Sequence, residues 1–132
     1  VGCVGAAQGA FDLTVAYITE RQAFGQAVSD FQNSRYKLAE MKTDIELCRA
    51  MAEKYTAQFI AGDLTSAEAS MLKLAASEMQ GRVADQCVQM FGGYGYMTEY
   101  TISRAYLDAR IQRIYGGTSE IMKELISRSI VN

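Results

Sequence analysis

The sequence contains no proline, and this absence restricts the possible folds more than any other feature of the chain. Average usage near 5% predicts roughly six or seven prolines in 132 residues. Proline breaks helices because it lacks the backbone N–H and its ring clashes with the preceding turn. A chain without it is expected to form long helices, and its eleven glycines are expected to supply the turns between them.

Apolar residues recur every three or four positions in three long segments, as on one face of an amphipathic helix. In residues 2–21 the stripe consists of Val4, Ala7, Phe11, Val15 and Ile18. Residues 38–59 carry an a/d heptad pattern made of Leu38, Met41, Ile45, Cys48, Ala52, Tyr55 and Phe59. Residues 72–90 continue this spacing with Leu72, Ala76, Met79, Val83, Gln86 and Met90. We therefore expect three long helices.

The first of these segments carries glycines at helical spacing. Gly2, Gly5 and Gly9 have no side chain, so another helix could approach this face closely. The chain opens at Val1 without a methionine. From these two features we expect that the first helix, and a region before it, has been cut.

Polar residues predict where the second and third helices begin. Ser29 with Gln32, and Thr65 with Glu68, have the spacing of a capping box, in which a side chain at each position bonds a free backbone N–H. Gly62 is expected to end the second helix.

The remaining glycines divide the last third of the chain. Residues 92–93 are expected to stop the third helix, and residues 116–117 to interrupt a shorter helical region at 101–113. Thr118 then caps a last helix, whose apolar positions are Ile121, Leu125 and Ile126. No β-strand is required. The sequence predicts an all-α protein, an up-down four-helix bundle forming a single domain over residues 1–132.

Composition excludes several classes of function. The sequence has no histidine, which removes imidazole catalysis and histidine-ligated metals, and it shows no acidic metal cluster. A net charge of −2 argues against nucleic-acid binding, and no apolar run is long enough to span a membrane. Cys3, Cys48 and Cys87 lie far apart among apolar neighbours and are interpreted as buried thiols in a reducing compartment.

Three helix ends carry residues suited to a phosphorylated cofactor. Arg21 lies in a loop beside the aromatic Phe24, which suits phosphate or ring contact. Gln89 precedes the exposed backbone of residues 92–93. Residues 116–120 open a helix whose N-terminal N–H groups favour an anion. Spacing alone favours helix capping and termination over cofactor binding at all three ends.

In this order, however, the motifs resemble the C-terminal helical domain of flavin-dependent acyl-CoA dehydrogenases. The matching segments are Arg-Gln-Ala-Phe-Gly at 21–25, Asp-Phe-Gln-Asn at 30–33, Leu-Ala-Glu-Met at 38–41, Val-Gln-Met-Phe-Gly-Gly-Tyr-Gly-Tyr at 88–96, Asp-Ala-Arg at 108–110 and Ile-Tyr-Gly-Gly-Thr-Ser-Glu-Ile at 114–121. They cover nearly the whole chain, and its ending is similar to the long-chain branch. The resemblance implies that the chain is a fragment of a larger three-domain enzyme.

The resemblance also implies an activity and partners. Such enzymes convert an acyl-CoA to a trans-2-enoyl-CoA, transfer electrons to FAD and then to an electron-transfer flavoprotein, and assemble as homodimers or homotetramers. The implied compartment is the cytoplasm of a bacterium or, in a eukaryote, the mitochondrial matrix. Two alternatives remain open: a non-catalytic helical interaction module, and a related flavin acyl-CoA oxidase or nitroalkane oxidase domain.

The resemblance assigns roles to matching positions. The residues implied to contact the FAD of a neighbouring subunit are Arg21, Phe24, Gln32, Gln89, Met90, Phe91, Gly92 and Gly93. Thr118 and Glu120 would contact the FAD of their own subunit. The residues implied to lie beside the acyl thioester are Tyr115, Gly116 and Gly117. No metal ligand is implied.

One position departs from the family pattern. Most members carry the catalytic glutamate where this chain has Gly116, which cannot accept a proton. In the isovaleryl and long-chain branches the base comes from the helix that opens this domain, at a place that the alignment puts upstream of Val1. The resemblance therefore implies no catalytic residue within the 132 residues and an isolated chain without activity.

Overall fold

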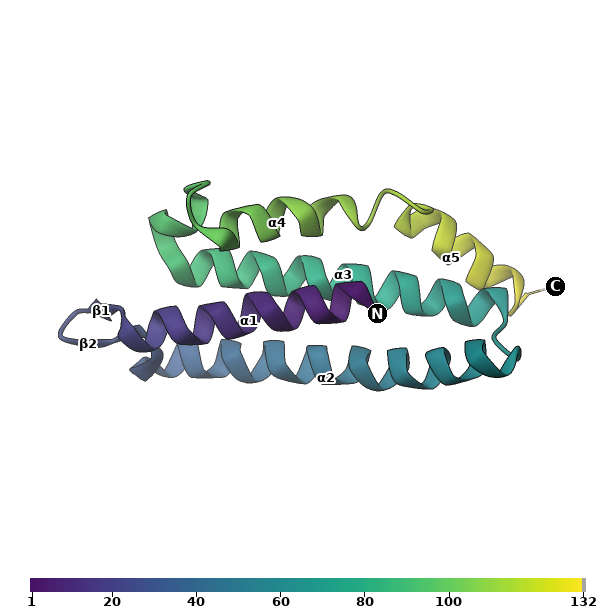
Figure 1. The fold of residues 1–132 in the computed structure, drawn as a ribbon, viewed down its shortest axis with the longest axis horizontal. Helices are drawn as coiled ribbons and strands as arrows, with labels where there is room; N and C mark the ends of the chain where they lie inside the picture. The colour runs from purple at the N-terminus through teal and green to yellow at the C-terminus, as the bar shows by residue number, and fades with distance from the viewer. Residues whose placement is uncertain (132) are drawn as a thin grey trace.

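A computed structural model describes residues 1–131, and within that range five α-helices form most of the fold (Figure 1). The helices are α1 (Gly2–Glu20), α2 (Gln32–Ala61), α3 (Ser66–Phe91), α4 (Thr101–Ile111) and α5 (Ser119–Arg128). Shorter elements are the strands β1 (Gln22–Ala23) and β2 (Gln26–Ala27) and the 3-10 helices η1 (Val28–Asp30) and η2 (Gly92–Tyr96). None of the helices is long and apolar enough to cross a membrane.

The helices are arranged as an up-down bundle. α1, α2 and α3 run alongside one another, and α4 followed by α5 forms the fourth position of the bundle, broken between residues 111 and 119 (Figure 1). The all-α four-helix prediction is confirmed. The break occurs where the sequence placed it, because Gly116 and Gly117 both take positive φ angles, which do not continue a helix.

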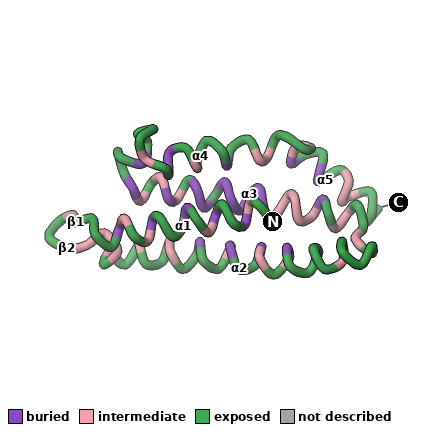
Figure 2. The backbone as a smooth tube through the Cα atoms, viewed as in Figure 1, coloured by how far each residue is buried: buried purple, intermediate pink, exposed green. Residues whose placement is uncertain are grey.

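α3 lies at the centre of the bundle and packs against all four other helices (Figure 2). Its buried side chains therefore face more than one neighbour, and they include Met79, Val83, Cys87 and Phe91 together with the polar Gln80. The single stripe predicted for this helix was too narrow. The apolar period of a sequence identifies one buried face of a helix, and it does not show that neighbouring helices cover α3 on several sides.

The heptad of α2 is largely confirmed. Met41, Ile45 and Cys48 are buried, as are Ala52 and Tyr55 one and two turns further on. The last predicted position is wrong, since Phe59 is 72% exposed. α1 reaches only part of the way along α2, so this end of α2 has no helix on that side (Figure 1).

The predicted faces of α1 and α5 need correction. In α1 the buried residues include Ala10 and Thr14, whereas Phe11 and Val15 are only partly buried. In α5 the buried apolar residue is Met122, one position after the predicted Ile121, which is exposed. The other predicted α1 positions, Val4, Ala7 and Ile18, are buried, and Leu125 and Ile126 of α5 are partly buried, so the errors are shifts of single positions by one residue.

The glycines near the start of α1 do not pack against another helix of this chain. Gly2, Gly5 and Gly9 are exposed, and a Cβ built on any of them would meet no atom within 4 Å. The expected close helix contact is therefore wrong for residues 1–131. Their face of α1 stays open in the structure.

Two helix starts differ in how well the sequence predicted them. At α3 the capping box is confirmed, because Thr65 accepts a hydrogen bond from the Glu68 amide while the Glu68 carboxylate accepts one from the Thr65 amide. At α2 the prediction is wrong: Phe31 precedes the helix without a side-chain cap, and Ser29 lies in η1. The chain approaches α2 through a 3-10 turn that local spacing did not reveal.

The segment between α1 and η1 contradicts the expectation that no strand would occur. Gln22 pairs with Ala27 and Ala23 with Gln26 in a two-residue antiparallel hairpin. At its tip Phe24 has a φ of 52° and Gly25 a φ of 82°. Positive φ angles at both central positions are typical of the tight turn that matches the twist of a hairpin.

All three cysteines are free, as the sequence predicted. Cys48 and Cys87 are buried and Cys3 is partly buried. Burial raises the pKa of each thiol, that of Cys87 to about 11, because the thiolate is poorly solvated in the core. None of the three is therefore activated as a nucleophile.

Candidate functional site

An open pocket of about 460 Å³ lies where the C-terminal end of α1 meets the C-terminal end of α3. We call it the hairpin-end pocket. Arg21 and residues 89–93, six of the residues predicted to contact cofactor, all line it. Residues about seventy positions apart in sequence come together because α1 and α3 both end here (Figure 1).

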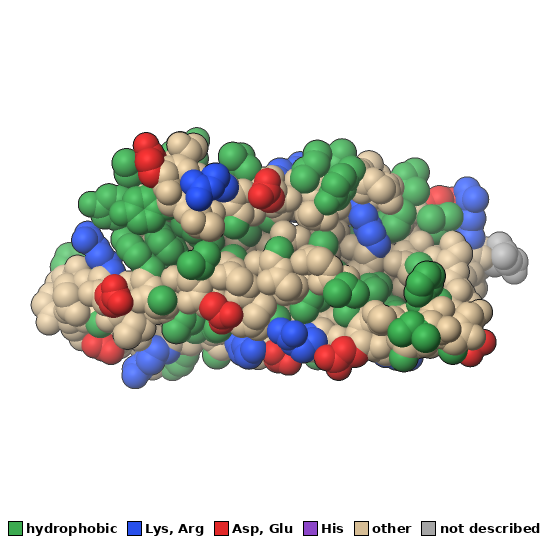
Figure 3. Space-filling view, in the orientation of Figure 1, with side chains coloured by type: hydrophobic (Ala, Val, Ile, Leu, Met, Phe, Trp, Pro, Cys, Tyr) green, Lys and Arg blue, Asp and Glu red, His purple; other side chains and the backbone are tan. Residues whose placement is uncertain are grey.

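Aromatic rings form one wall of the pocket. Tyr17 stacks on Phe91 with ring centroids 4.0 Å apart, and Phe91 meets the edge of Tyr100 at 6.2 Å. Tyr94 packs against Tyr100 at 5.2 Å. Figure 3 shows hydrophobic side chains gathered at this end of the bundle. These contacts fix a flat, partly exposed surface against which a planar ring could stack.

Arg21 is held over this wall. Its guanidinium carbon lies 5.7 Å from the centroid of the Tyr94 ring, a cation–π distance. The side chain is exposed, and no carboxylate within residues 1–131 forms an ion pair with it. Its charge and donors therefore remain available for an anion such as a diphosphate.

Sequence reasoning missed Tyr17 and Tyr94, which also line this pocket. A signal for Tyr17 was present, since it precedes Arg21 by one helical turn and faces the same side. Tyr94 lies inside the glycine-rich motif, where local sequence gives no indication that its ring turns toward α1.

The glycines after α3 have distinct roles. Gly92 ends the helix with a φ of 62°, and a Cβ on Gly92 or Gly93 would meet nothing within 4 Å. Gly95, in contrast, is buried, and a Cβ there would lie 2.5 Å from the Val88 carbonyl oxygen. Gly95 is thus required by packing, whereas the Cβ side of Gly92 and Gly93 is open beside the pocket, although the Gly92 N–H already donates to the Gln89 carbonyl.

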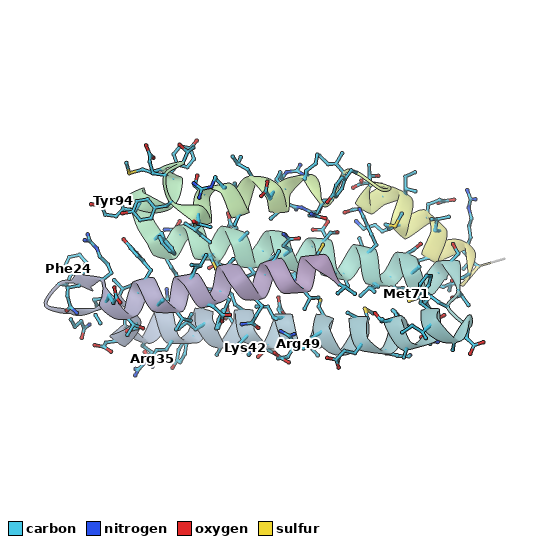
Figure 4. The ribbon with its side chains drawn as sticks, in the orientation of Figure 1. Phe24, Arg35, Lys42, Arg49, Met71 and Tyr94 are labelled. Atoms are coloured by element: carbon cyan, nitrogen blue, oxygen red, sulfur yellow. The ribbon has the colours of Figure 1, made fainter. Side chains whose placement is uncertain are left out.

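Two other predicted residues lie at the same end of the molecule but outside the pocket lining. Phe24 is 98% exposed at the hairpin tip, where its ring meets the edge of the Phe31 ring at 6.4 Å (Figure 4). Gln32, the first residue of α2, donates a hydrogen bond to the Tyr36 hydroxyl.

The remaining predicted residues lie in a separate region, the α4–α5 junction, which we define as residues 112–120. None of them lines the hairpin-end pocket. The junction lies on the α4–α5 side of the bundle, away from the hairpin (Figure 1). The structure therefore divides the predicted site residues into two groups.

The start of α5 has most of its polar groups bonded within the chain. The Thr118 hydroxyl oxygen accepts a hydrogen bond from the Ile121 amide, and the Ser119 hydroxyl donates to Glu78 at 2.7 Å. The pKa of Glu120 is lowered by its own backbone amide and by the Thr118 hydroxyl. A carboxylate already occupies this helix N-terminus, so the structure offers little there to a second anion.

Gly116 and Gly117 differ in their surroundings. A Cβ on Gly116 would point into open space, whereas one on Gly117 would collide with the terminal methyl of Met122. The resemblance implies that most family members would carry a glutamate side chain at the position of Gly116, and the space there is open. This chain presents only backbone there, flanked by the half-exposed Tyr115.

Comparison with known proteins gives consistent results along the whole chain. Residues 1–131 match the family model for the acyl-CoA dehydrogenase C-terminal domain. The rat protein "Long-chain specific acyl-CoA dehydrogenase, mitochondrial" is 52% identical over 122 residues, which cover 92% of this chain and 28% of that protein.

Solved structures agree in fold. An acyl-CoA dehydrogenase from Geobacillus kaustophilus superposes with a TM-score of 0.96 at 42% identity, covering 98% of this chain and 34% of that one. A glutaryl-CoA dehydrogenase from Mycobacterium smegmatis, solved in complex with FADH2, gives a TM-score of 0.94 at 26% identity over the same shares. This chain spans about a third of the length of these relatives. It belongs to the acyl-CoA dehydrogenase family and corresponds to the C-terminal domain of that family.

Proposed function

We propose that this chain is the C-terminal cofactor-binding and oligomerisation domain of an FAD-dependent acyl-CoA dehydrogenase. The observation that carries the proposal is the hairpin-end pocket, where a cation without an ion-pair partner in the described chain, open glycine backbone and stacked aromatic rings converge. This donor set fits the diphosphate and adenine portions of a dinucleotide. Family membership and the FADH2 complex of a relative support the same cofactor.

The bound FAD would supply the redox chemistry by accepting a hydride from the β-carbon of an acyl-CoA. Arg21 would bind the diphosphate of a neighbouring subunit's FAD, and residues 89–93 would hold its adenosine side through backbone and the Gln89 amide. Phe24 at the hairpin tip and Gln32 at the start of α2 would contact the same molecule. The junction would face the chain's own FAD and the acyl thioester through Tyr115 and the glycines that follow it.

The proton acceptor would come from outside these residues. Because Gly116 has no side chain, we place the base on the polypeptide preceding Val1. The open space beside Gly116 provides a test in the intact flavoprotein. Replacing the upstream glutamate with glutamine should abolish acyl-CoA-dependent flavin reduction, and Gly116→Glu in that background should restore part of it. Full activity of the glutamine variant would contradict this placement.

The electron acceptor and assembly are part of the same proposal. An electron-transfer flavoprotein would take the electrons, which is supported by structural similarity to a chain from a study entitled "Electron transferring flavoprotein of Acidaminococcus fermentans: Towards a mechanism of flavin-based electron bifurcation". Two cofactor-facing regions on one chain favour a homodimer or homotetramer, in which one FAD contacts two subunits. Relatives occur in mitochondria and in Bacillus subtilis, and we place this protein in the matrix or the bacterial cytoplasm accordingly.

The central test measures FAD affinity in the intact flavoprotein after Arg21→Ala. Loss of a charge-assisted diphosphate contact worth about 1.5 to 3 kcal/mol should weaken FAD binding by roughly 10- to 100-fold. Arg35→Ala is the matched control, because Arg35 is an exposed arginine near the same end that does not line the pocket (Figure 4). Equal FAD affinity in the two variants would refute the assigned role of the pocket.

A further inference from the structure

Side-chain hydrogen bonds join the α4–α5 junction to α3 near both of its ends and in its middle. Lys73 of α3 donates a hydrogen bond from Nζ to the carbonyl oxygen of Gly117. Glu78, one turn further along α3, accepts from the Ser119 hydroxyl at 2.7 Å and from the Arg113 guanidinium at 3.4 Å. Three points of a short loop are thus tied to one rigid helix.

The Lys73 contact is unusual because of its partner. Lys73 is partly buried, and no carboxylate in the described chain pairs with it. A partly desolvated ammonium without an anionic partner gains strongly from any acceptor within reach. The Gly117 carbonyl oxygen is that acceptor, so the ammonium holds the peptide that joins Gly117 to Thr118.

The Arg113 end of the junction is also fixed by shape. The Arg113 guanidinium lies against α3 at Gly81, where a Cβ would come within 3.2 Å of it. It pairs with the Glu78 carboxylate, and its Nε atom is buried without a hydrogen-bond partner. The Ser119 amide additionally donates to the Arg113 carbonyl at 3.2 Å and closes the loop. Glycine at position 81 lets the planar group pack flat.

These contacts act on a segment that has backbone hydrogen bonds at its two ends, from the amides of Ile114 and Ser119, but a glycine pair between them. Gly116 and Gly117 have φ angles of 62° and 100°. Glycine populates many other backbone conformations, so two in succession define no fixed shape without outside contacts. The α3 side chains therefore select one conformation of the backbone at residues 114–118.

We propose that Lys73 and Glu78 are positioning residues that fix the backbone of residues 114–118 for the acyl-CoA reaction. The inference rests on the proposed function, which places this backbone beside the acyl thioester. Neither side chain needs to touch substrate. A backbone displaced by about 1 Å can cost roughly 100-fold in rate, so a fixed junction is a direct requirement for turnover.

The experiment uses the intact flavoprotein with Lys73→Met, which removes the donor to Gly117, and Glu78→Met, which removes the acceptor for Ser119 and Arg113. Lys37→Met is the matched control, because Lys37 is partly buried like Lys73 but pairs only with Glu40 on its own helix. Hydrogen exchange at residues 114–118 should become about tenfold faster in the two α3 variants and stay unchanged in the control. The kcat for flavin reduction should fall about tenfold with a smaller change in KM. FAD content should not change.

A conservative variant that recovers kcat distinguishes a positioning role of Lys73 from a general effect on stability. Lys73→Arg keeps a donor for the Gly117 carbonyl and should recover most of the kcat that Lys73→Met loses. If Lys73→Met does not fold, Ser119→Ala removes one tie by deleting a single oxygen and should give the same exchange signature. Unchanged exchange at 114–118, or faster exchange with normal kcat, would overturn the inference. Absence of acyl-CoA-dependent flavin reduction in the wild type, with exchange still responding, would instead refute the proposed function.

Discussion

The hairpin-end pocket and the α4–α5 junction have similar sequences, but their polar groups differ in whether they are open or already hydrogen-bonded. Both combine a glycine pair with polar residues at a helix terminus. At the pocket the guanidinium of Arg21 and the backbone at Gly92 and Gly93 remain open. At the junction Thr118 and Ser119 are already hydrogen-bonded within the chain. The polar groups of the first region therefore stay available to a ligand, whereas those of the second are mostly used within the chain.

This difference arises from the position of each helix end relative to α3. The pocket lies at the last turn of α3, where the helix ends, so its polar groups have few neighbours with which to pair. The junction lies over the middle of α3, where Lys73 and Glu78 reach it. Helix-end chemistry alone therefore does not separate a ligand site from a structural support.

The largest expected difference in stability comes from a matched pair of glycine substitutions. Gly117→Ala introduces a Cβ at a φ of 100° that collides with Met122, and should destabilise the fold by about 2 to 3 kcal/mol. Gly93→Ala meets no atom within 4 Å and should change stability by less than about 0.5 kcal/mol. Denaturant unfolding of both variants checks the pair. Similar losses would remove the distinction between the regions.

A variant of a helix cap outside both regions shows whether a loss of stability by itself lowers FAD affinity. Thr65→Ala removes the confirmed capping box of α3 and should cost about 1 kcal/mol. FAD affinity of the intact flavoprotein should be unaffected, because Thr65 precedes the N-terminus of α3, at the end of the bundle opposite the hairpin-end pocket (Figure 1). Should FAD binding fall in this variant, losses seen at the pocket could not be assigned to direct contacts.

A substitution at the hairpin tip should affect binding but not the stability of the fold. Phe24 is 98% exposed, so Phe24→Ala should change the unfolding free energy by less than about 0.5 kcal/mol. If its ring contacts the neighbouring subunit's FAD, the same variant should lower FAD affinity or weaken subunit association. Titration calorimetry and sedimentation measure the two effects. A marked loss of stability would show that the tip supports its own chain instead.

The smallest expected effect concerns pH. The pKa of Glu120 is lowered from an ordinary value of 4.5, first by its own backbone amide and then by the Thr118 hydroxyl. A lowered folded pKa stabilises the protein above the ordinary value, and this contribution is lost as pH falls through the folded pKa. Glu120→Gln should therefore reduce the acid dependence of stability. Unfolding at neutral and acid pH tests this, and an identical pH profile would contradict it.

Much of the fold could be predicted because its signals are local. The capping box at Thr65, the end of α2 before Gly62 and the cap at Thr118 all depend on residues within one turn of each other. Burial was predicted less well. Phe59 satisfies the heptad yet is exposed, because burial needs a neighbouring element that periodicity cannot supply.

Some residues of the candidate site could likewise be predicted from the sequence and others could not. Motif resemblance identified Arg21 and residues 89–93, and the structure brings them together in one pocket. It did not identify Tyr17 or Tyr94, whose roles depend on a stacked aromatic wall formed between two helix ends. The assigned contacts with FAD remain predictions for the experiments above.

By itself the sequence determined the helices, because the absence of proline, the apolar period and the caps act through neighbours along the chain. Only the tertiary structure decided which glycine-containing helix end stays open and which is tied down. That outcome depends on where α3 passes beneath each end, and on whether side chains such as Lys73 and Glu78 can reach it. Such distances are set by packing and leave no trace in local spacing.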